Sequence, residues 1–398
     1  MKTKLLILFL ALTSVANAQW YFNHSFNNSV HAFLESEGSL YVGLSGAGVY
    51  RSMDAGENWE AVNNGIQFGG AYIYVLCSRN DSIFAGGFGE VCFTNDKGEN
   101  WTLMDLNLSL NSFVYALAIK DNYLFAGIGG IDTLRGVYRK QLGQLGWAYT
   151  SNGLPANVAV NTFLVSDNML FVGTSQGVYA SENNGLHWEP SSFGMGEAPV
   201  VHSFYEAAGL LLAGTNAGLF VSYDHGGSWI ASESLPSTSV VRCLAGNDTS
   251  IVAGTYNGGF ISHDNGLSWS DFTPQAPDNV FFMSLTTLDN FYYAGTGAGI
   301  YTTNPDVAVS LSETRIIDHS GLLLYPNPIK RGQPLTIETQ VGLSGIRIYD
   351  ARGQLLRNIA PGHSPKNTIC TASLAPGLYI IETIHAAEAI SWKRFLVK

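Results

Sequence analysis

The sequence predicts an all-β protein, and three features of its composition support this. Its 398 residues include 44 glycines and 48 aromatic residues (21 Phe, 19 Tyr and 8 Trp), whereas only 13% are charged. Abundant glycine and aromatic residues are typical of short strands joined by tight turns. Hydrophobic residues make up 46% of the chain, which is enough to form a packed core. The length predicts two or three domains.

Residues 1–18 have the pattern of a secretion signal. Two lysines precede an apolar run at residues 5–12, and Ala-Asn-Ala at 16–18 supplies a small-x-small cleavage site. The apolar run is shorter than the about 20 residues that cross a bilayer as a helix. We therefore expect cleavage after Ala18 and export across the inner membrane.

The four cysteines show neither disulfide nor zinc-ligand spacing. Cys77 and Cys92 are expected on alternate strands of one unit, about 9.5 Å apart, which is too far for a disulfide. Cys243 and Cys370 stand far from both in the sequence. The sequence therefore predicts four small buried apolar residues, no metal site and no cofactor.

A repeat of about 41 residues extends from residue 20 to residue 302. A glycine closes an apolar strand once in each repeat, and successive glycines are 43, 41, 46, 41, 40 and 41 residues apart. These glycines are Gly43, Gly86, Gly127, Gly173, Gly214, Gly254 and Gly295. A large apolar residue stands ten positions before each of them. A period near 41 with four short strands is typical of one propeller blade, so the repeat predicts a seven-bladed β-propeller.

A second signal follows the third strand of most repeats, with the pattern Ser-x-Asp-x-Gly-x-x-Trp. Its residues are Ser52, Asp54, Gly56 and Trp59; Thr94, Asp96, Gly98 and Trp101; Ser222, Asp224, Gly226 and Trp229; and Ser262, Asp264, Gly266 and Trp269. The fourth repeat has Ser181, Asn183, Gly185 and Trp188, and the third keeps only Trp147. An Asp or Asn in a hairpin turn accepts backbone N–H bonds and Gly permits positive φ, so the motif predicts a structural turn before the fourth strand.

This spacing resembles the Asp-box (BNR-like) repeat, and the resemblance covers roughly residues 20–302. Asp-box repeats are known from β-propellers such as sialidases, some xyloglucan-cleaving glycoside hydrolases, photosystem II assembly factors and sortilin-type receptors. In those propellers the boxes lie on the rim away from the ligand face. The resemblance therefore implies that the Asp-box residues are structural.

The seventh repeat has no Asp box, which would leave its sheet without an outer strand. An open sheet edge invites aggregation. The segment Trp20-Tyr21-Phe22 has the pattern of a strand that belongs to no repeat. We expect this N-terminal strand to close blade seven, which gives a propeller at residues 19–302 and a linker at residues 303–320.

Residues 321–398 form a separate module with a different charge. Residues 19–302 hold 8 Lys and Arg against 24 Asp and Glu, a net charge of −16, whereas residues 321–398 hold 9 against 4, a net charge of +5. Short stretches in the module alternate apolar and polar residues, which predicts a small Ig-like antiparallel β-sandwich.

Three segments of this module carry a second resemblance. They are Leu-Tyr-Pro-Asn-Pro at 324–328, Ile-Tyr-Asp-Ala-Arg-Gly at 348–353 and Leu-Ala-Pro-Gly-Leu-Tyr-Ile at 374–380. Their order and spacing resemble the type A C-terminal sorting domain of the Bacteroidetes type IX secretion system. The resemblance implies that the secretion machinery is a partner and that the protein reaches the outer-membrane surface or the extracellular space.

Ligands of propellers are expected where the loops between blades and those between second and third strands converge. Candidate ligand-binding residues on this face are Phe68, Tyr72, Phe88, Glu90, Asp132, Arg135, Tyr256 and Asp278, with Phe281 nearby. Asp132 and Arg135 belong to an insertion at residues 128–136. Exposed aromatic side chains here are suited to stack on sugar rings or to grip a peptide.

Two functions remain open at this point, and binding is favoured over catalysis. The first is a monomeric, non-catalytic propeller that binds a carbohydrate or protein ligand. The second is a glycoside hydrolase or lyase, which needs two carboxylates separated by about 5–5.5 Å or about 6.5–9.5 Å. Glu90, Asp132, Glu197 and Asp278 are available, but no local pattern selects a pair, so no catalytic residue is assigned.

Other functions are disfavoured by charge and by missing motifs. A sialidase would carry a Phe/Tyr-Arg-Ile-Pro motif, which does not occur. A role like that of the photosystem II assembly factors is less favoured than binding, because those factors often show a basic ligand patch whereas the repeats of this chain are acidic. The net charge of −16 opposes nucleic acid and other polyanions and favours neutral or cationic partners.

Overall fold

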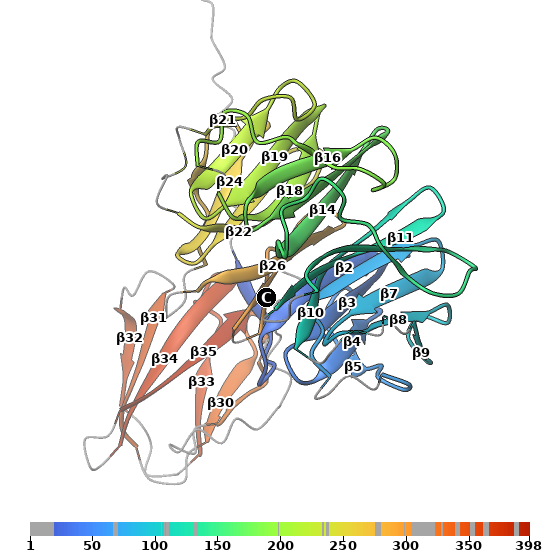
Figure 1. Cartoon of the computed structure of the whole chain (residues 1–398). Helices are drawn as coiled ribbons and strands as arrows, with labels where there is room; N and C mark the ends of the chain where they lie inside the picture. Colours follow the sequence, from blue (N-terminus) through green and yellow to red (C-terminus); the bar gives the residue numbers. More distant parts are fainter. Residues whose placement is uncertain are drawn as a thin grey trace, which may run out of the picture. The chain divides into compact units, whose positions relative to one another are not determined.

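Figure 1 shows a computed structural model of the chain. The structure describes residues 20–66, 71–104, 106, 108, 111–130, 134–197, 199–232, 235, 239–274, 280–297, 299–304, 323–327, 329–338, 343–350, 355–360, 366–385 and 390–398. The chain divides into two compact units, residues 1–308 and 309–398. The predicted signal peptide lies outside the described residues.

The first unit contains seven four-stranded antiparallel sheets, so the predicted seven-bladed propeller is confirmed. Blades one to three are β2 (Val30–Ser36), β3 (Ser39–Leu44), β4 (Gly48–Ser52) and β5 (Glu60–Ala61); β6 (Val75–Arg79), β7 (Ser82–Gly86), β8 (Val91–Thr94) and β9 (Thr102–Leu103); and β10 (Ser112–Lys120), β11 (Tyr123–Gly130), β12 (Gly136–Gln141) and β13 (Ala148–Tyr149).

Blades four to six have the same four-strand order. They are β14 (Val160–Ser166), β15 (Met169–Thr174), β16 (Gly177–Ser181) and β17 (Glu189–Pro190); β18 (Val201–Ala207), β19 (Leu210–Thr215), β20 (Gly218–Ser222) and β21 (Ile230–Ala231); and β22 (Val241–Gly246), β23 (Ile251–Thr255), β24 (Gly258–Ser262) and β25 (Ser270–Asp271). In blades one to six the fourth strand has two residues, and both are exposed.

Blade seven joins the two ends of the propeller. Its strands are β26 (Phe282–Leu288), β27 (Phe291–Thr296), β28 (Ile300–Thr302) and, from the start of the chain, β1 (Tyr21–His24). Strand β1 pairs antiparallel with β28, with Tyr21 opposite Thr302. Trp20 precedes β1, is buried and donates its indole N–H to the Phe272 carbonyl oxygen at 2.6 Å.

The first strands of the seven blades form a closed ring. Each contacts the first strand of the next blade, and β26 contacts β2. In Figure 1 the labelled first strands β2, β10, β14, β18, β22 and β26 follow one another along the colour scale, in the order of their blades. The axis of the propeller therefore lies among these first strands.

Packing between blades explains the seven repeated glycines. A Cβ atom on any of them would lie within 3.0 Å of one apolar side chain at the start of the next blade. The seven partners are Ile73, Val114, Val160, Val201, Val241, Phe282 and Val30. The absence of a side chain at these positions lets neighbouring sheets approach closely, so the 41-residue period records the contact between blades.

The Ser-x-Asp-x-Gly segments fold as one repeated turn. In blade one the Ser52 hydroxyl donates to Asp54 Oδ1 at 2.8 Å, and the Gly56 N–H donates to Ser52 Oγ at 2.7 Å. The Asn58 N–H donates to Asp54 Oδ1 at 2.8 Å. Gly56 has φ of 98° and Ala55 has φ of 55°, which is the left-handed region. Equivalent bonds occur in blades two, four, five and six.

The second unit is a pair of antiparallel sheets. One contains β29 (Leu323–Tyr325), β30 (Pro334–Glu338) and β33 (Lys366–Cys370); the other contains β31 (Leu343–Asp350), β32 (Leu355–Ile359), β34 (Gly377–His385) and β35 (Ile390–Val397). Their shared core includes Leu335, Ile337, Ile346, Ile348 and Ile381. The predicted sandwich is therefore present.

The prediction that all four cysteines are buried is wrong for Cys370. Cys92 and Cys243 are buried and Cys77 is partly buried, whereas Cys370 is exposed. Strand β33 alternates exposed and buried residues, and Cys370 falls on its exposed face. The described residues contain no helix that is long and apolar enough to cross a membrane.

Candidate functional site

In six of the seven blades the first strand has a register shift close to its start. One residue of each of these strands lies within or beside this β-bulge, and in blade two Tyr74 directly precedes β6. The seven residues, which we call the axial ring, are His31, Tyr74, Tyr115, Asn161, His202, Arg242 and Met283. A bulge re-aims a side chain that regular strand geometry would direct elsewhere.

Contacts between blades show that the side chains of the axial ring lie close together around the propeller axis. The rings of His31 and Tyr74 have centroids 5.4 Å apart, and those of Tyr74 and Tyr115 are 5.3 Å apart. On the opposite side, Arg242 Nη1 donates to His202 Nδ1 at 3.2 Å. The charge of Arg242 in blade six also acts on His31 in blade one and on Tyr115 in blade three. Blades six, one and three meet at the axis, so these side chains surround it.

The axial ring lies on the face that carries the loops between second and third strands. In blade two, Phe88 in this loop forms an isolated bridge with Phe113 at the start of β10. In blade one, the loop N–H of Ser45 donates to the Ser29 carbonyl oxygen, immediately before β2, at 3.0 Å. This is the face on which the converging loops predict a ligand.

Burial sets the protonation states of the ring. Burial, together with the positive charge of Arg242, lowers the pKa of His202 to about 4 and also lowers the pKa of His31. Burial raises the pKa of Tyr74 to about 12 and also raises that of Tyr115. At neutral pH both imidazoles are therefore uncharged and both phenols keep their protons.

Arg242 is the cation of the axial ring. Its guanidinium carbon lies 5.8 Å from the centre of the Tyr256 ring, and Tyr256 is 48% exposed. Among the described residues no carboxylate forms an ion pair with Arg242, whereas buried Arg51 on β4 is bound to both Glu60 and Glu99. Arg242 therefore differs in its surroundings from the structural arginine of blade one.

An aromatic wall, made of Tyr72, Phe88 and Phe113, borders the axial ring at blades two and three. Ring centroids are 4.8 Å apart for Tyr72 and Phe88, and 5.1 Å apart for Phe88 and Phe113. Phe113 also lies 5.7 Å from Tyr115 of the ring. All three wall residues are partly exposed, so they keep apolar surface for a ligand.

The structure places three of the residues proposed from sequence beside the axial ring, in two separate groups. Tyr72 and Phe88 form the aromatic wall, and Tyr256 lies against Arg242 with Phe281 6.2 Å away. The Arg135 carbonyl instead accepts a bond from the Tyr149 hydroxyl of the outer strand β13. Phe68, Asp132 and Asp278 lie outside the described residues.

The carboxylates proposed for hydrolysis do not form a described pair. Glu90 lies in the loop that precedes β8 of blade two, and its charge acts on buried Cys92. Glu197 is exposed in the segment that joins blades four and five. The described residues also contain no group of three side chains that could hold a metal ion.

Sequence reasoning missed the axial ring, although a signal for it exists. Every member stands twelve residues before the repeated glycine of its own blade, from His31 before Gly43 to Met283 before Gly295. The residue types at this position differ from repeat to repeat, so a search for recurring residues passes over them. Aligning the repeats on their glycines and examining the variable columns would have found it.

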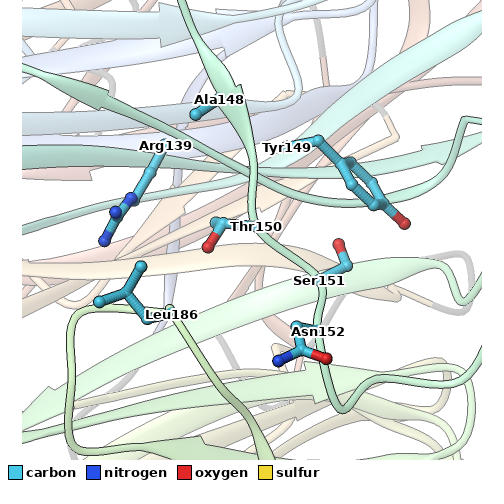
Figure 2. A pocket seen from close by; sticks show the side chains of 7 residues that line it. All are labelled: Arg139, Ala148, Tyr149, Thr150, Ser151, Asn152 and Leu186. Carbon is cyan, nitrogen blue, oxygen red and sulfur yellow. The ribbon is translucent and has the colours of Figure 1, made fainter.

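Two shallow hollows lie away from the axis, between the outer parts of neighbouring blades. One, of about 380 Å³, is lined by Arg139, residues 148–152 and Leu186. Figure 2 shows Arg139, Thr150 and Leu186 on one side of this backbone segment and Tyr149 on the other. The second, of about 350 Å³, includes Phe84, Phe93 and Leu142. Arg139 is already engaged here, because its Nη1 donates to the Asn184 carbonyl oxygen at 2.6 Å.

The two units are thus a seven-bladed propeller with a ring of polar and aromatic side chains near its axis, and a C-terminal module of two sheets. Residues 323–398 match the family described as secretion system C-terminal sorting domain. The chain therefore carries a type IX secretion sorting domain, and such domains mark proteins destined for the cell surface or the extracellular space. No curated protein matches this chain in sequence.

Solved structures of low sequence identity share the fold. The extracellular domain of the one-component system BT4673 from B. thetaiotaomicron is 16% identical with a TM-score of 0.61, over 94% of this chain and 59% of that one. PorZ of Porphyromonas gingivalis, a surface component of its type IX secretion system, is 18% identical with a TM-score of 0.53, over 95% and 60%. YCF48 from Cyanidioschyzon merolae is 12% identical with a TM-score of 0.56, over 72% and 99%. The chain thus spans about three fifths of the first two structures.

Proposed function

We propose that this protein is a monomeric, non-catalytic binding propeller, which its sorting domain delivers to the cell surface or the extracellular space. Its ligand, a carbohydrate or a protein, binds on the face that carries the axial ring. The observation that carries this proposal is the juxtaposition of the aromatic wall with a ring of polar side chains from several blades. Apolar surface with a few convergent polar groups is typical of ligand sites.

Binding is preferred over hydrolysis because the described part of the face offers hydrogen-bonding and aromatic groups rather than paired acids. The polar atoms identified near the axis belong to histidine, tyrosine, asparagine and arginine. A hydrolase would require a raised-pKa carboxylic acid close to a second carboxylate. A peptide is an open alternative to a sugar as ligand, since YCF48 has also been solved bound to a D1 peptide.

The proposal is tested with the full mature chain and a panel of immobilised polysaccharides. We expect retention on some of them without release of reducing ends. Replacing Tyr72 and Phe88 together by Ala should abolish retention, whereas Tyr149→Ala, on an exposed outer strand, should not change it. Release of reducing ends that stops on mutation of Asp132 or Asp278 would instead establish the hydrolase.

A further inference from the structure

Arg242 is the one cationic member of the axial ring, and it points to the chemistry of the ligand. We propose that the axial ring binds an acidic saccharide, with the carboxylate of a uronic acid bound by Arg242 beside His202. This inference rests on the proposed function and narrows it to one ligand class. The neighbouring aromatic rings then contact the sugar, and the remaining polar groups contact its hydroxyls.

The first argument is the charge of Arg242. Its described contacts are the neutral imidazole of His202 at 3.2 Å and the face of Tyr256 at 5.8 Å. Neither contact neutralises a guanidinium, which remains charged at every accessible pH. An incoming carboxylate forms the charge-assisted bonds that such a group favours, and Arg binds carboxylates with two parallel N–H bonds.

The second argument is the distribution of the other polar groups. Asn161 and His31 belong to blades four and one, and the hydroxyls of Tyr74 and Tyr115 belong to blades two and three. These groups provide both donors and acceptors around the axis. A sugar ring carries hydroxyls on several sides and has apolar faces that suit aromatic contacts, so it matches this arrangement better than a single extended peptide strand.

The net charge of the propeller limits how densely charged an acidic ligand can be. The repeats have a net charge of −16, which repels anions at long range. Screening reduces that field beyond about 8 Å at physiological ionic strength, whereas Arg242 acts at contact distance. Isolated carboxylates are therefore favoured over a densely charged polyanion.

Binding of a carboxylate also links to the protonation of His202. The groups around it in the axial ring are Arg242 from β22, His31 from β2, and the two tyrosines from blades two and three; β14 and β26 contribute the neutral Asn161 and Met283. Burial is the main cause of the low pKa of His202, about 4, and the charge of Arg242 is the second. A bound anion offsets the repulsion from Arg242, so it raises the pKa of His202. Affinity should then be higher at pH 5 than at pH 7.

The experiment is calorimetric titration of the full mature chain with trisaccharides of galacturonate, glucuronate and mannuronate. Each is compared with its carboxyl-reduced form, which is a neutral sugar of the same ring shape, and hexaglutamate tests the peptide alternative. At least one acid should bind more than tenfold tighter than its reduced form. Arg242→Gln should remove that difference and Arg242→Lys should restore part of it. Arg139→Gln, at the outer hollow, should leave it intact.

Thermal unfolding of each variant separates lost binding from lost folding, because a variant that only loses binding keeps the unfolding temperature of the unaltered chain. Equal binding of acid and reduced forms overturns the inference, and so does failure of all the acids to bind. Tighter binding of hexaglutamate assigns the site to an acidic peptide and overturns the saccharide assignment. In each of these cases the proposed function survives if polysaccharide retention still depends on Tyr72 and Phe88. Failure of the acidic-saccharide inference can therefore be distinguished from failure of the proposed function.

Discussion

Trp188 of blade four donates its indole N–H to the carbonyl oxygen of Thr150 in blade three, at 2.8 Å. The same relation to the preceding blade occurs for Trp101 with Val62 and for Trp229 with Ser191. Trp147 makes an equivalent bond to Met104, although its repeat has lost the rest of the motif. In these four repeats the tryptophan is therefore a link between blades as well as an anchor of its own turn.

Replacing Trp188 by Phe should destabilise the propeller by about 1–2 kcal/mol, because a buried carbonyl loses its donor. The free energy of unfolding in urea measures this. Trp269→Phe is the matched control, since this N–H donates within its own turn, to Gly266 at 3.1 Å, and its side chain is less buried. Equal losses for the two variants would contradict the role of the tryptophan between blades.

Gly127→Ala should destabilise the propeller by about 1–3 kcal/mol, because the added methyl group meets Val160 of the next blade within 3.0 Å. The midpoint of urea unfolding reports this change. Adding Val160→Ala to the variant should recover part of the loss by making room. Gly297→Ala is the control, because its methyl would meet only the ring edge of Phe281 at 3.1 Å. A tolerated Gly127→Ala would disprove the packing explanation of the repeat.

The Asp turns should make stability sensitive to acid. Hydrogen bonds from Thr94 and Asn100 hold the pKa of Asp96 at about 2, and bonds from Ser228 and Ser222 do the same for Asp224. Because the folded pKa lies below the unfolded value of about 3.9, this stabilisation is fully present above the unfolded value. It is lost as the pH falls from about 4 to about 2.

Urea midpoints measured between pH 6 and pH 2 should therefore fall steeply below pH 4. Asp96→Asn and Asp224→Asn together should flatten that decline, since Asn183 makes the equivalent backbone bond without a titrating group. Asp81→Asn, at an exposed turn between β6 and β7, serves as the control. An unchanged acid profile in the double variant would show that other groups govern it.

Trp20→Ala should loosen the closure of blade seven. Trp20 packs against the rings of Phe272 and Phe282, with centroids 5.2 Å away in each case. Truncating a buried aromatic side chain costs about 3–5 kcal/mol, and an unpaired β28 edge promotes self-association. Size-exclusion chromatography and urea unfolding should show both effects, whereas Phe22→Ala, on a side chain that is 40% exposed, should show neither strongly.

The sequence predicted the arrangement of blades because that arrangement depends on recurring residues. The glycines must accept a side chain from the next blade, and the Asp turns must satisfy the same backbone groups each time, so both recur at fixed spacing. Three of the proposed site residues, Tyr72, Phe88 and Tyr256, could be chosen from loop position alone. The burial of Cys370 could not be judged, because it depends on which face of β33 the sandwich covers.

The amino-acid sequence by itself determined the number of blades, their turns and the sorting module, since each is specified by local spacing or by a contiguous motif. Only the tertiary structure decided that His31, His202 and Arg242 act on one another. These residues belong to blades one, five and six and are as much as 211 positions apart, 242 minus 31. They come together because the propeller closes into a ring and because the β-bulges direct these side chains towards the axis. The residue types differ from blade to blade, so no repeated residue in the sequence marks these positions.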